Sequence, residues 1–496
     1  MEDVMAAKIN DLRSALEFLK AIPGQFVETD VEVNPWGELS AVYKYIGAGG
    51  TVIRPTKEGP VLQYNNVKGF PGRPVVIGVL ASRRRVGHLL DYDPDRLGFL
   101  LADCVKRPIN PVPTDEANPP CQEVVYKATD PGFDVRKIIP ASTNTPIDGG
   151  PYITIGMVYA KDVETGEKDV TIHRMCLHSE DEIAMFFTPG ARHIGSMREK
   201  AESLGKPLPV SVSIGVDPAI EIAACFEPPT TPIGYDELGI AGAIRGEAVK
   251  LAKCLTVDAE CIANAEYVIE GELVPDYYVR EDRPTENGNA MPEFPGYVGP
   301  APAKCPVFKV KAITTRKNPI MQTCIGPSEE HRSMAGIPTE ASILMMVDKA
   351  MPGRLLNCYA HPAGCGKYLA ILQFKKSQPS DEGRQRQAAL LAFSAFAELK
   401  TVILVDEDVD IFDTNDVLWA MQTRYQGDID TIFIPGVRCH PLDPSARTVY
   451  NPMIHDTGIT CKTIFDATVP YALKHEFVRA PFLDLDPRKW WPDYEG

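Results

Sequence analysis

Three side chains in the middle of the chain have the chemical types of a mixed oxygen and nitrogen metal site. Asp169 opens the segment DVTIHRM, His193 lies in PGARHIG, and Glu237 lies in GYDELGIAGAIRGE. Two carboxylates and one imidazole suit Mn²⁺ or Mg²⁺ better than a metal that prefers thiolates. Arg174 and Arg192 lie near two members of this set, so a phosphate could contact metal and guanidinium together. The spacing alone is weakly specific, because any long chain contains such triples.

A lone carboxylate, Glu293, lies in the rigid and apolar stretch AMPEFPGYVGP at 290–300. Its three prolines fix φ and remove backbone donors, so we expect a stiff loop that is neither helix nor central strand. A loop glutamate commonly points to solvent, which is the simpler interpretation. Among apolar neighbours such as Phe294 the carboxyl could instead stay protonated and serve as a proton donor.

Two glycine clusters and one acidic segment are weaker signals. GAGG at 47–50 and GCGK at 364–367 lack the context and spacing of nucleotide-binding loops, so plain turns are expected there. The segment VDEDVDIFD at 405–413 follows an apolar strand and resembles a divalent-metal site. Acids at the end of a strand are more often caps or solvated turn residues, which is the interpretation that we favour.

Composition bounds the class of protein. With 496 residues the chain should form about three domains, and 44% hydrophobic with 24% charged residues is typical of soluble globular proteins. A net charge of −16 disfavours nucleic acid and anionic membrane as partners. Twelve cysteines without a CxxC pair fit the reduced thiols of a cytosolic protein. Neither a signal peptide nor a membrane span of roughly 20 apolar residues is recognisable, so we expect a cytoplasmic protein.

Hydrophobic patterns divide the chain into three predicted domains, 1–125, 126–325 and 326–496. In the first, an α/β domain, a helix over the first 20 residues places Leu12, Leu16 and Leu19 on one face, and a strand is expected at 74–81. In the second, five segments have the pattern of strands, PYITIGMVYA, DVTIHRMCL, PLPVSVSIGV, EYVIEGELV and PVFKVKAITT. Strands separated by long inserts suggest a barrel with helical decoration.

The third domain alternates helices and strands, which predicts an α/β domain with a parallel sheet. PTEASILMMVDKAM is expected to be a helix and KYLAILQF a strand, and the same alternation continues through TVILVDEDVDIF and NDVLWAMQTR. The amphipathic tail that follows carries Trp490 and Trp491. It is expected to pack on another subunit.

The segments DVTIHRM, PGARHIG, YDELGIAGAIRGE and PEFPGY, in this order, resemble the UbiD family of prenylated-flavin-dependent decarboxylases. The resemblance covers nearly the whole chain and is strongest towards protocatechuate (3,4-dihydroxybenzoate) and gallate decarboxylases. It implies a multidomain α/β (α+β) fold. The expected parts are an N-terminal α/β domain, a central split β-barrel like that of flavin reductases, and a C-terminal α/β domain whose tail helps the protein dimerise.

The resemblance also implies a cofactor, prenylated FMN, whose phosphate is held by Mn²⁺ with K⁺ nearby. The matching metal ligands are Asp169, His193 and Glu237, although the family often has asparagine where Asp169 stands. A separate flavin prenyltransferase would supply the cofactor. The residues expected to line it are Asp169, Val170, Thr171, Ile172, His173, Arg174, Arg192, His193, Glu237 and Lys367.

Glu293 matches the family's proton donor, and Arg174 matches the arginine of a Glu-Arg-Glu network found in many relatives. Those relatives have a second glutamate five residues before the first, where this chain has Gly288, so the full network cannot be carried over. Three further polar residues are expected to contact a substrate hydroxyl, His331, His440 and Lys367. Taken singly, each of them would more often be a structural residue.

The function implied is a carboxy-lyase that decarboxylates a hydroxylated benzoic acid non-oxidatively and reversibly, through a covalent substrate adduct on prenylated FMN. The preferred substrate is 3,4-dihydroxybenzoate, giving catechol and CO₂, with gallate and 4-hydroxybenzoate as alternatives. Two other classes stay open, a metal-dependent hydrolase that uses the three ligands with a water, and a non-catalytic flavin-binding protein. The expected assembly is a homodimer or a hexamer built as a trimer of dimers.

Overall fold

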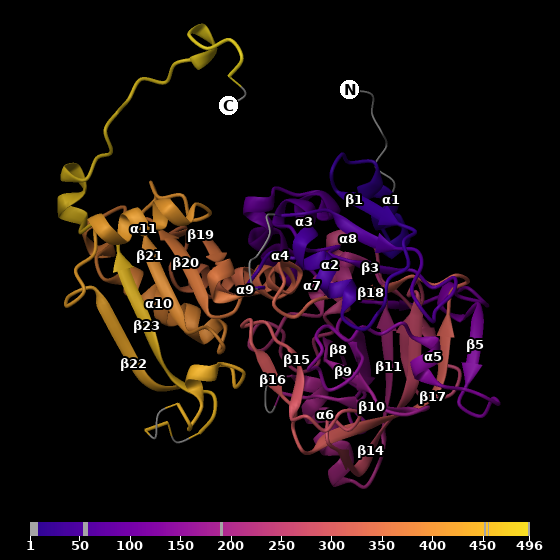
Figure 1. Ribbon diagram of the computed structural model, residues 1–496. Helices are drawn as coiled ribbons and strands as arrows, with labels where there is room; N and C mark the ends of the chain where they lie inside the picture. The colour runs from indigo at the N-terminus through magenta and orange to yellow at the C-terminus, as the bar shows by residue number, and fades with distance from the viewer. Residues whose placement is uncertain (1–7, 53–57, 189–191, 451–452, 455, 495–496) are drawn as a thin grey trace.

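The computed structural model describes residues 8–52, 58–188, 192–450, 453–454 and 456–494 (Figure 1). Helix α1 (Leu12–Lys20) begins after Asp11, whose carboxylate accepts a backbone N–H of the first turn and caps the helix. Leu12, Leu16 and Leu19 are buried on one face, as the sequence predicts. The predicted helix is therefore confirmed from Leu12 onward, whereas its portion over residues 1–7 lies outside the described residues.

A four-stranded sheet forms the N-terminal part, in the order β1-β2-β3-β18. The strands are β1 (Phe26–Thr29), β2 (Val61–Tyr64), β3 (Val75–Ile77) and β18 (Met321–Thr323). The strand predicted at 74–81 ends early, because Gly78 adopts a φ of +87° and turns the chain out of the sheet. The helices of this part are α2 (Glu38–Ile46), α3 (Arg83–Leu90) and α4 (Leu97–Lys106). Because β18 returns from far along the chain to pair with β3, the N-terminal and central parts are joined.

An antiparallel sheet of nine strands forms the central part, in the order β6-β9-β10-β17-β14-β11-β7-β8, with β5 paired to β17. All five segments predicted as strands contribute to it. The strands are β5 (Val124–Lys127), β6 (Tyr152–Ile153), β7 (Met157–Lys161), β8 (Lys168–Ile172), β9 (Met175–Leu177), β10 (Glu182–Met185), β11 (Leu208–Ile214), β14 (Tyr267–Val279) and β17 (Cys305–Thr315). Within the described residues no pairing joins β8 to β6, so backbone hydrogen bonds do not close this sheet into a barrel.

A five-stranded sheet forms the C-terminal part, in the order β19-β20-β21-β23-β22. The strands are β19 (Leu355–Ala360), β20 (Leu369–Phe374), β21 (Thr401–Val405), β22 (Thr431–Arg438) and β23 (Ile459–Ala467). β20, β21 and β23 are parallel, but β19 and β22 pair antiparallel at the edges, so the predicted parallel sheet is correct only at its centre. The connection from β19 to β20 is too short for the crossover that parallel neighbours require.

Helix α9 (Glu329–Ala350) lies between the C-terminal part and the rest of the molecule (Figure 1). The sequence prediction begins this helix at Pro338, but the structure begins it at Glu329 and keeps the proline inside. Burial of the helix from Arg332 to Leu344 offsets the hydrogen bond that Pro338 cannot donate. Helix α11 (Thr414–Thr423) lies in the segment NDVLWAMQTR, as predicted, and α10 (Arg384–Ala395) precedes β21. None of the described helices combines the length and apolar character needed to cross a membrane.

Beyond β23 the chain forms a tail with two short 3-10 turns, at Tyr471–Glu476 and Pro487–Lys489. Figure 1 shows this tail, in yellow, leaving the C-terminal sheet and extending away from it. Large apolar side chains along it are exposed, and Phe482 is 92% exposed. Its expected packing on another subunit stays a prediction.

Candidate active site

The three residues proposed as metal ligands lie together. Asp169 is on β8, His193 begins α6 (His193–Ser203), and Glu237 immediately precedes α8 (Leu238–Arg245). One ligand atom from each lies within 4.8 Å of the others, and His193 Nδ1 is 3.0 Å from Asp169 Oδ1. Glu237 Oε2 is buried without a hydrogen-bond partner, and burial together with the Asp169 carboxylate raises the pKa of Glu237. A divalent cation would satisfy that oxygen and balance both carboxylates.

Arg174, between β8 and β9, lies between two glutamates. Its Nε and Nη2 donate to both oxygens of Glu281 at 2.7 Å, and its Nη1 donates to Glu293 Oε1 at 2.5 Å. Burial lowers the pKa of the Arg174 guanidinium, but the two carboxylates outweigh burial and raise it overall. Gly288 stands at the motif position of the second glutamate, so the motif alone did not predict a second acid beside Arg174. The structure places Glu281, twelve residues before Glu293, in contact with Arg174.

A hairpin presents Glu293 to Arg174. Strands β15 (Asn289–Pro292) and β16 (Val298–Pro300) flank the turn, in which the Glu293 N–H donates to the Tyr297 carbonyl at 2.8 Å. A Cβ at Gly299 would lie 2.9 Å from Glu293 Cγ, so only glycine allows β16 to come this close. The expected stiff loop is thus a turn between two short strands. The Glu293 side chain is only 14% exposed, so it does not extend into bulk solvent.

Phe294, the residue after Glu293, is surrounded by the three residues expected to contact a substrate hydroxyl. His331 stacks on its ring with centroids 5.5 Å apart, and His440 meets it edge-on at 4.8 Å. Lys367 Nζ lies 5.3 Å from the ring centroid. Burial and the nearby Lys367 charge lower the pKa of His331 to about 3, so its imidazole is neutral. The structure therefore brings residues from α9 and from the C-terminal part to the hairpin that holds Glu293.

A chain of charges, here called the cavity network, continues from Lys367. It consists of Arg192, Glu227, Lys367, Glu398 and His440. Lys367 Nζ donates to Glu398 Oε2 at 2.6 Å and lies 3.8 Å from Glu227 Oε1. Glu227 pairs with Arg192 Nη2 at 2.5 Å, and His440 Nε2 is 3.3 Å from Glu398 Oε1. Neither Glu227 nor Glu398 belongs to a motif with recognisable spacing, so neither could be predicted from the sequence.

A cavity of about 950 Å³, its open mouth included, has four members of this network in its walls, Arg192, Lys367, Glu398 and His440. The expected cofactor-lining residues that reach it are Ile172, His173, Arg174, Arg192 and Lys367. Val170 instead packs in the hydrophobic core. Thr171 Oγ1 and His173 Nε2 are buried without hydrogen-bond partners, so polar atoms remain available to a bound group.

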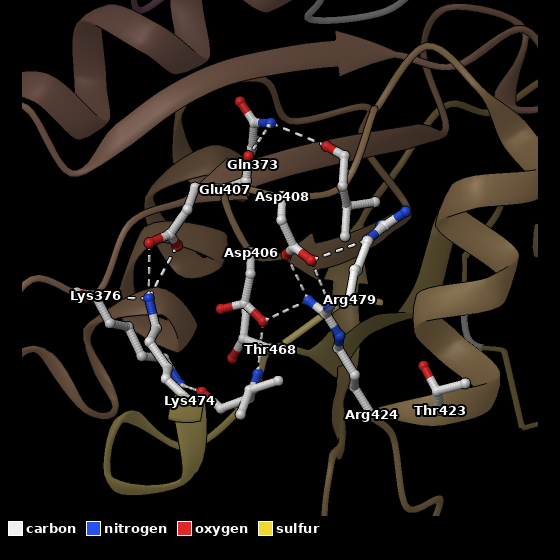
Figure 2. Close-up of polar contacts among 12 residues, drawn as sticks. Gln373, Lys376, Asp406, Glu407, Asp408, Thr423, Arg424, Thr468, Lys474 and Arg479 are labelled. Carbon is white, nitrogen blue, oxygen red and sulfur yellow. Dashed lines mark hydrogen bonds and ion pairs between the residues drawn. The ribbon is translucent and has the colours of Figure 1, made fainter. Parts of the chain in front are cut away.

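Three acids of the segment at 405–413, Asp406, Glu407 and Asp408, belong to an ion-pair network, here called the tail network (Figure 2). Arg424 donates to Asp406 at 3.0 Å and to both oxygens of Asp408. Two residues of the tail complete it, because Lys474 binds Glu407 at 2.9 Å and Arg479 binds Asp408 at 3.0 Å. Among the described residues, the group of possible metal ligands lies at Asp169, His193 and Glu237 instead. The favoured interpretation of caps and solvated turn residues is confirmed in part, because Asp413 caps α11 and Glu407 and Asp408 are exposed residues of a turn, whereas Asp406 is buried.

The two glycine clusters form turns, as expected. In GCGK, Gly366 has a φ of +74°, and a Cβ there would lie 2.8 Å from the Arg332 carbonyl oxygen. In GAGG, a Cβ at Gly50, with a φ of +63°, would lie 2.3 Å from the carbonyl oxygen of Pro327. Both glycines therefore allow close backbone contact with the start of α9, which lines the cavity.

Three domain profiles match this chain, all described as 3-octaprenyl-4-hydroxybenzoate carboxy-lyase domains. The N-terminal domain matches residues 18–105, the Rift-related domain residues 112–329 and the C-terminal domain residues 332–467. The chain belongs to the UbiD family. The resemblance carried by the four sequence motifs is thereby confirmed.

Individual UbiD relatives are similar over almost the full length. A gallate decarboxylase of Lactiplantibacillus plantarum is 55% identical over 97% of this chain and 98% of its own. The crystal structure of apo Klebsiella pneumoniae 3,4-dihydroxybenzoic acid decarboxylase shares 54% identity with a TM-score of 0.93, over 98% of this chain and 100% of that one. An evolved dimeric form of the UbiD-class enzyme HmfF from Pelotomaculum thermopropionicum, in complex with prFMN, shares 32% identity with a TM-score of 0.80, over 95% and 97% of the two chains.

Proposed function

We propose that this protein catalyses the non-oxidative, reversible decarboxylation of a hydroxylated benzoic acid, most readily 3,4-dihydroxybenzoate to catechol and CO₂. The observation that carries the proposal is one cavity lined by Glu293 and by three further polar side chains, Lys367, His331 and His440. Glu293 is bound to Arg174, and the other three surround the adjacent Phe294. The relatives that act on gallate and on 3,4-dihydroxybenzoate support the same substrate class. Gallate is the second candidate, since it differs by one ring hydroxyl.

Prenylated FMN with Mn²⁺ is the cofactor that we propose for this site. When bound, it supplies an electrophilic ring that accepts electrons as CO₂ leaves. Asp169, His193 and Glu237 would hold the metal, and Arg192, beside His193 in the chain, would face the flavin phosphate. The unpartnered Glu237 oxygen and the complex of a relative with prFMN support this assignment. K⁺ and the substrate adduct stay predictions.

The charged and the neutral side chains of the cavity have different roles in the proposed reaction. We assign Glu293 the role of proton donor to the ring carbon that loses CO₂, held in place by Arg174 and, through it, by Glu281. Lys367 supplies a cation that favours a deprotonated ring hydroxyl. Burial lowers the pKa of Lys367, but the Glu398 and Glu227 carboxylates outweigh it and keep the ammonium charged. Neutral His331 offers a lone pair to a hydroxyl proton.

We also propose the domain boundaries, the source of the cofactor and the assembly. We divide the chain into domains at 1–125, 126–325 and 326–496, with the central sheet acting as the split barrel of flavin reductases. A flavin prenyltransferase supplies the cofactor, and the exposed apolar tail contributes to a homodimer or a hexamer of dimers.

The test is CO₂ release from 3,4-dihydroxybenzoate, gallate and 4-hydroxybenzoate. Protein co-expressed with a flavin prenyltransferase is compared with protein made without it. We expect release only from the loaded protein, and fastest from 3,4-dihydroxybenzoate. Hydrolysis of an ester or amide without any flavin would favour a metal-dependent hydrolase. Bound flavin with no CO₂ release from any of the three acids would contradict the proposal and favour a binding protein.

A further inference from the structure

We propose that Glu398 is a positioning residue that holds Lys367 in place to recognise the second of two adjacent hydroxyl groups on the substrate ring. Glu398 lies just before β21 and lines the same cavity as Lys367, His331 and His440. The inference rests on the proposed function, and it concerns a residue outside the motifs that identify the family.

Glu398 uses both of its oxygens. Oε2 accepts Lys367 Nζ at 2.6 Å, and Oε1 lies 3.3 Å from His440 Nε2. The second carboxylate near Lys367, that of Glu227, is 3.8 Å away, too far for a hydrogen bond. Its closer contact, at 2.5 Å, is with Arg192. Glu398 is therefore the acceptor that fixes the position of the ammonium group.

The neighbouring imidazole determines which side chain can stand at 398. His440 Nδ1 accepts the Leu442 backbone N–H at 3.0 Å, so a neutral ring carries its proton on Nε2. Burial and the Lys367 charge lower the pKa of His440 well below its usual value, which keeps the ring neutral. Nε2–H is then a second donor group beside the Lys367 ammonium, 3.3 Å from Glu398 Oε1, and a carboxylate offers an acceptor oxygen to each. The amide of glutamine has one acceptor and one donor group.

Two groups of opposite character then face a ring bound in the cavity. His331 Nδ1 is buried without a hydrogen-bond partner, and no contact fixes His331 to Glu398 among the described residues. His331 can accept a proton from one hydroxyl, whereas Lys367 can donate to the oxygen of the adjacent one. Only the second contact depends on Glu398. Loss of Glu398 should therefore weaken binding of an adjacent diol more than binding of a single phenol.

Calorimetric titration of the holoenzyme with catechol and with phenol tests this difference. In Glu398→Gln we expect catechol to bind about tenfold more weakly, which corresponds to one hydrogen bond to a charged group, while phenol changes less than about twofold. Glu398→Asp keeps both acceptor oxygens on a shorter side chain, so its loss should be smaller. The matched control is Glu382→Gln, which breaks the pair with buried Lys376 at 2.9 Å in the same part of the molecule. Glu382→Gln should change neither the catechol nor the phenol dissociation constant.

Equal weakening of catechol and phenol would mean that Glu398 only supports the local fold, and it would overturn the inference. An unchanged catechol constant would overturn it as well. If Glu398→Gln does not fold, the ratio of the catechol and phenol constants in Glu398→Asp decides, and an unchanged ratio contradicts the inference. Failure of the wild-type holoenzyme to release CO₂ from any hydroxybenzoate would instead contradict the proposed function, so the two failures are distinguishable.

Discussion

The cavity network and the tail network are both dense groups of paired charges that line a pocket, but the two pockets differ in the side chains that surround them. In the tail network Asp406, Glu407 and Asp408 each pair with a basic side chain. Two of these basic side chains, Lys474 and Arg479, belong to the tail itself. Aromatic and apolar walls surround the cavity network, and neutral histidines lie beside it. Charge density along the sequence therefore indicates an anchor for the chain as readily as a reactive site.

The setting of the two networks, and not their unpartnered polar atoms, distinguishes them. His173 and His331 in the cavity wall each keep a buried atom without a hydrogen-bond partner, but so do Asp406 and Arg424 of the tail network. Such atoms are costly unless a ligand or water satisfies them. The tail network instead joins the chain beyond β23 to the carboxyl end of β21, as Figure 2 shows. The following substitutions test whether function follows the first group and local stability the second.

Removal of Glu281 should have the largest effect on stability. Glu281→Gln leaves buried Arg174 with one carboxylate, and breaking a buried ion pair costs about 3–5 kcal/mol of unfolding free energy. The decarboxylation rate should fall with it, because Glu293 loses a fixed partner. Urea unfolding of the variant measures the first effect. The control Glu272→Gln breaks the exposed pair with Lys311 on the same sheet and should cost less than about 1 kcal/mol. Equal losses in the two variants would contradict a special role for the Arg174 site.

Acid should destabilise the protein partly through His331. The pKa of this imidazole is lowered to about 3 in the folded protein by burial, from an ordinary value of about 6.5. Between these values the unfolded chain binds more protons, so stability is present above pH 6.5 and is lost as the pH falls towards 3. In His331→Gln the slope of unfolding free energy against pH should decrease by up to about 1.4 kcal/mol per pH unit. His475, 75% exposed, provides the control, and His475→Gln should leave the slope unchanged. A slope unaffected by His331→Gln would show that this imidazole is not kept neutral by burial.

If Asp169, His193 and Glu237 hold the metal, removal of one of them should weaken cofactor binding. We expect this effect to be smaller than the preceding two. His193→Ala should weaken retention of flavin by at least about tenfold. Loss of a group that only supports a metal ligand already lowers metal affinity by about that factor, and loss of the ligand itself should lower it at least as much. Asp169→Asn should retain most of it, since an amide oxygen can replace the carboxylate oxygen near His193. Flavin absorbance and bound manganese after gel filtration measure both. Full retention by the alanine variant would remove His193 from the ligand set.

Substitutions in the tail network should have the smallest effect. Arg479→Ala removes exposed pairs with Asp408 and Asp416, so unfolding free energy should fall by less than about 1 kcal/mol. The rate of CO₂ release per bound flavin should not change. A large loss of activity would mean that the tail network takes part in the reaction, and it would remove the distinction between the two regions.

Local patterns predicted the elements better than they predicted the partners between elements. The leucine spacing was sufficient to predict α1, and the alternation of apolar residues was sufficient to predict the central strands. Each of these patterns depends only on neighbours within one segment. The antiparallel edges β19 and β22 and the early start of α9 did not follow, because packing between distant segments decides them. Pro338 suggested a helix start that burial overrides.

The candidate site shows the same limit. Asp169, His193 and Glu237 were grouped correctly by residue type, but Glu281 was missed because the expected position was occupied by Gly288. One signal was available, since a buried arginine has five N–H donors and needs more acceptors than Glu293 provides. Glu398 had no comparable signal, because its partners lie far from it in sequence.

The most direct test of the central claim compares Glu293→Gln with Glu407→Gln, one acid from each region, in loaded protein. The rate of CO₂ release from 3,4-dihydroxybenzoate is measured per bound flavin. We expect Glu293→Gln to lose about 10²–10⁴-fold, the usual contribution of a positioned proton donor, and Glu407→Gln to match the wild type. Similar rates in the two variants would contradict the assignment of Glu293, and with it the claim that the cavity is where the reaction takes place.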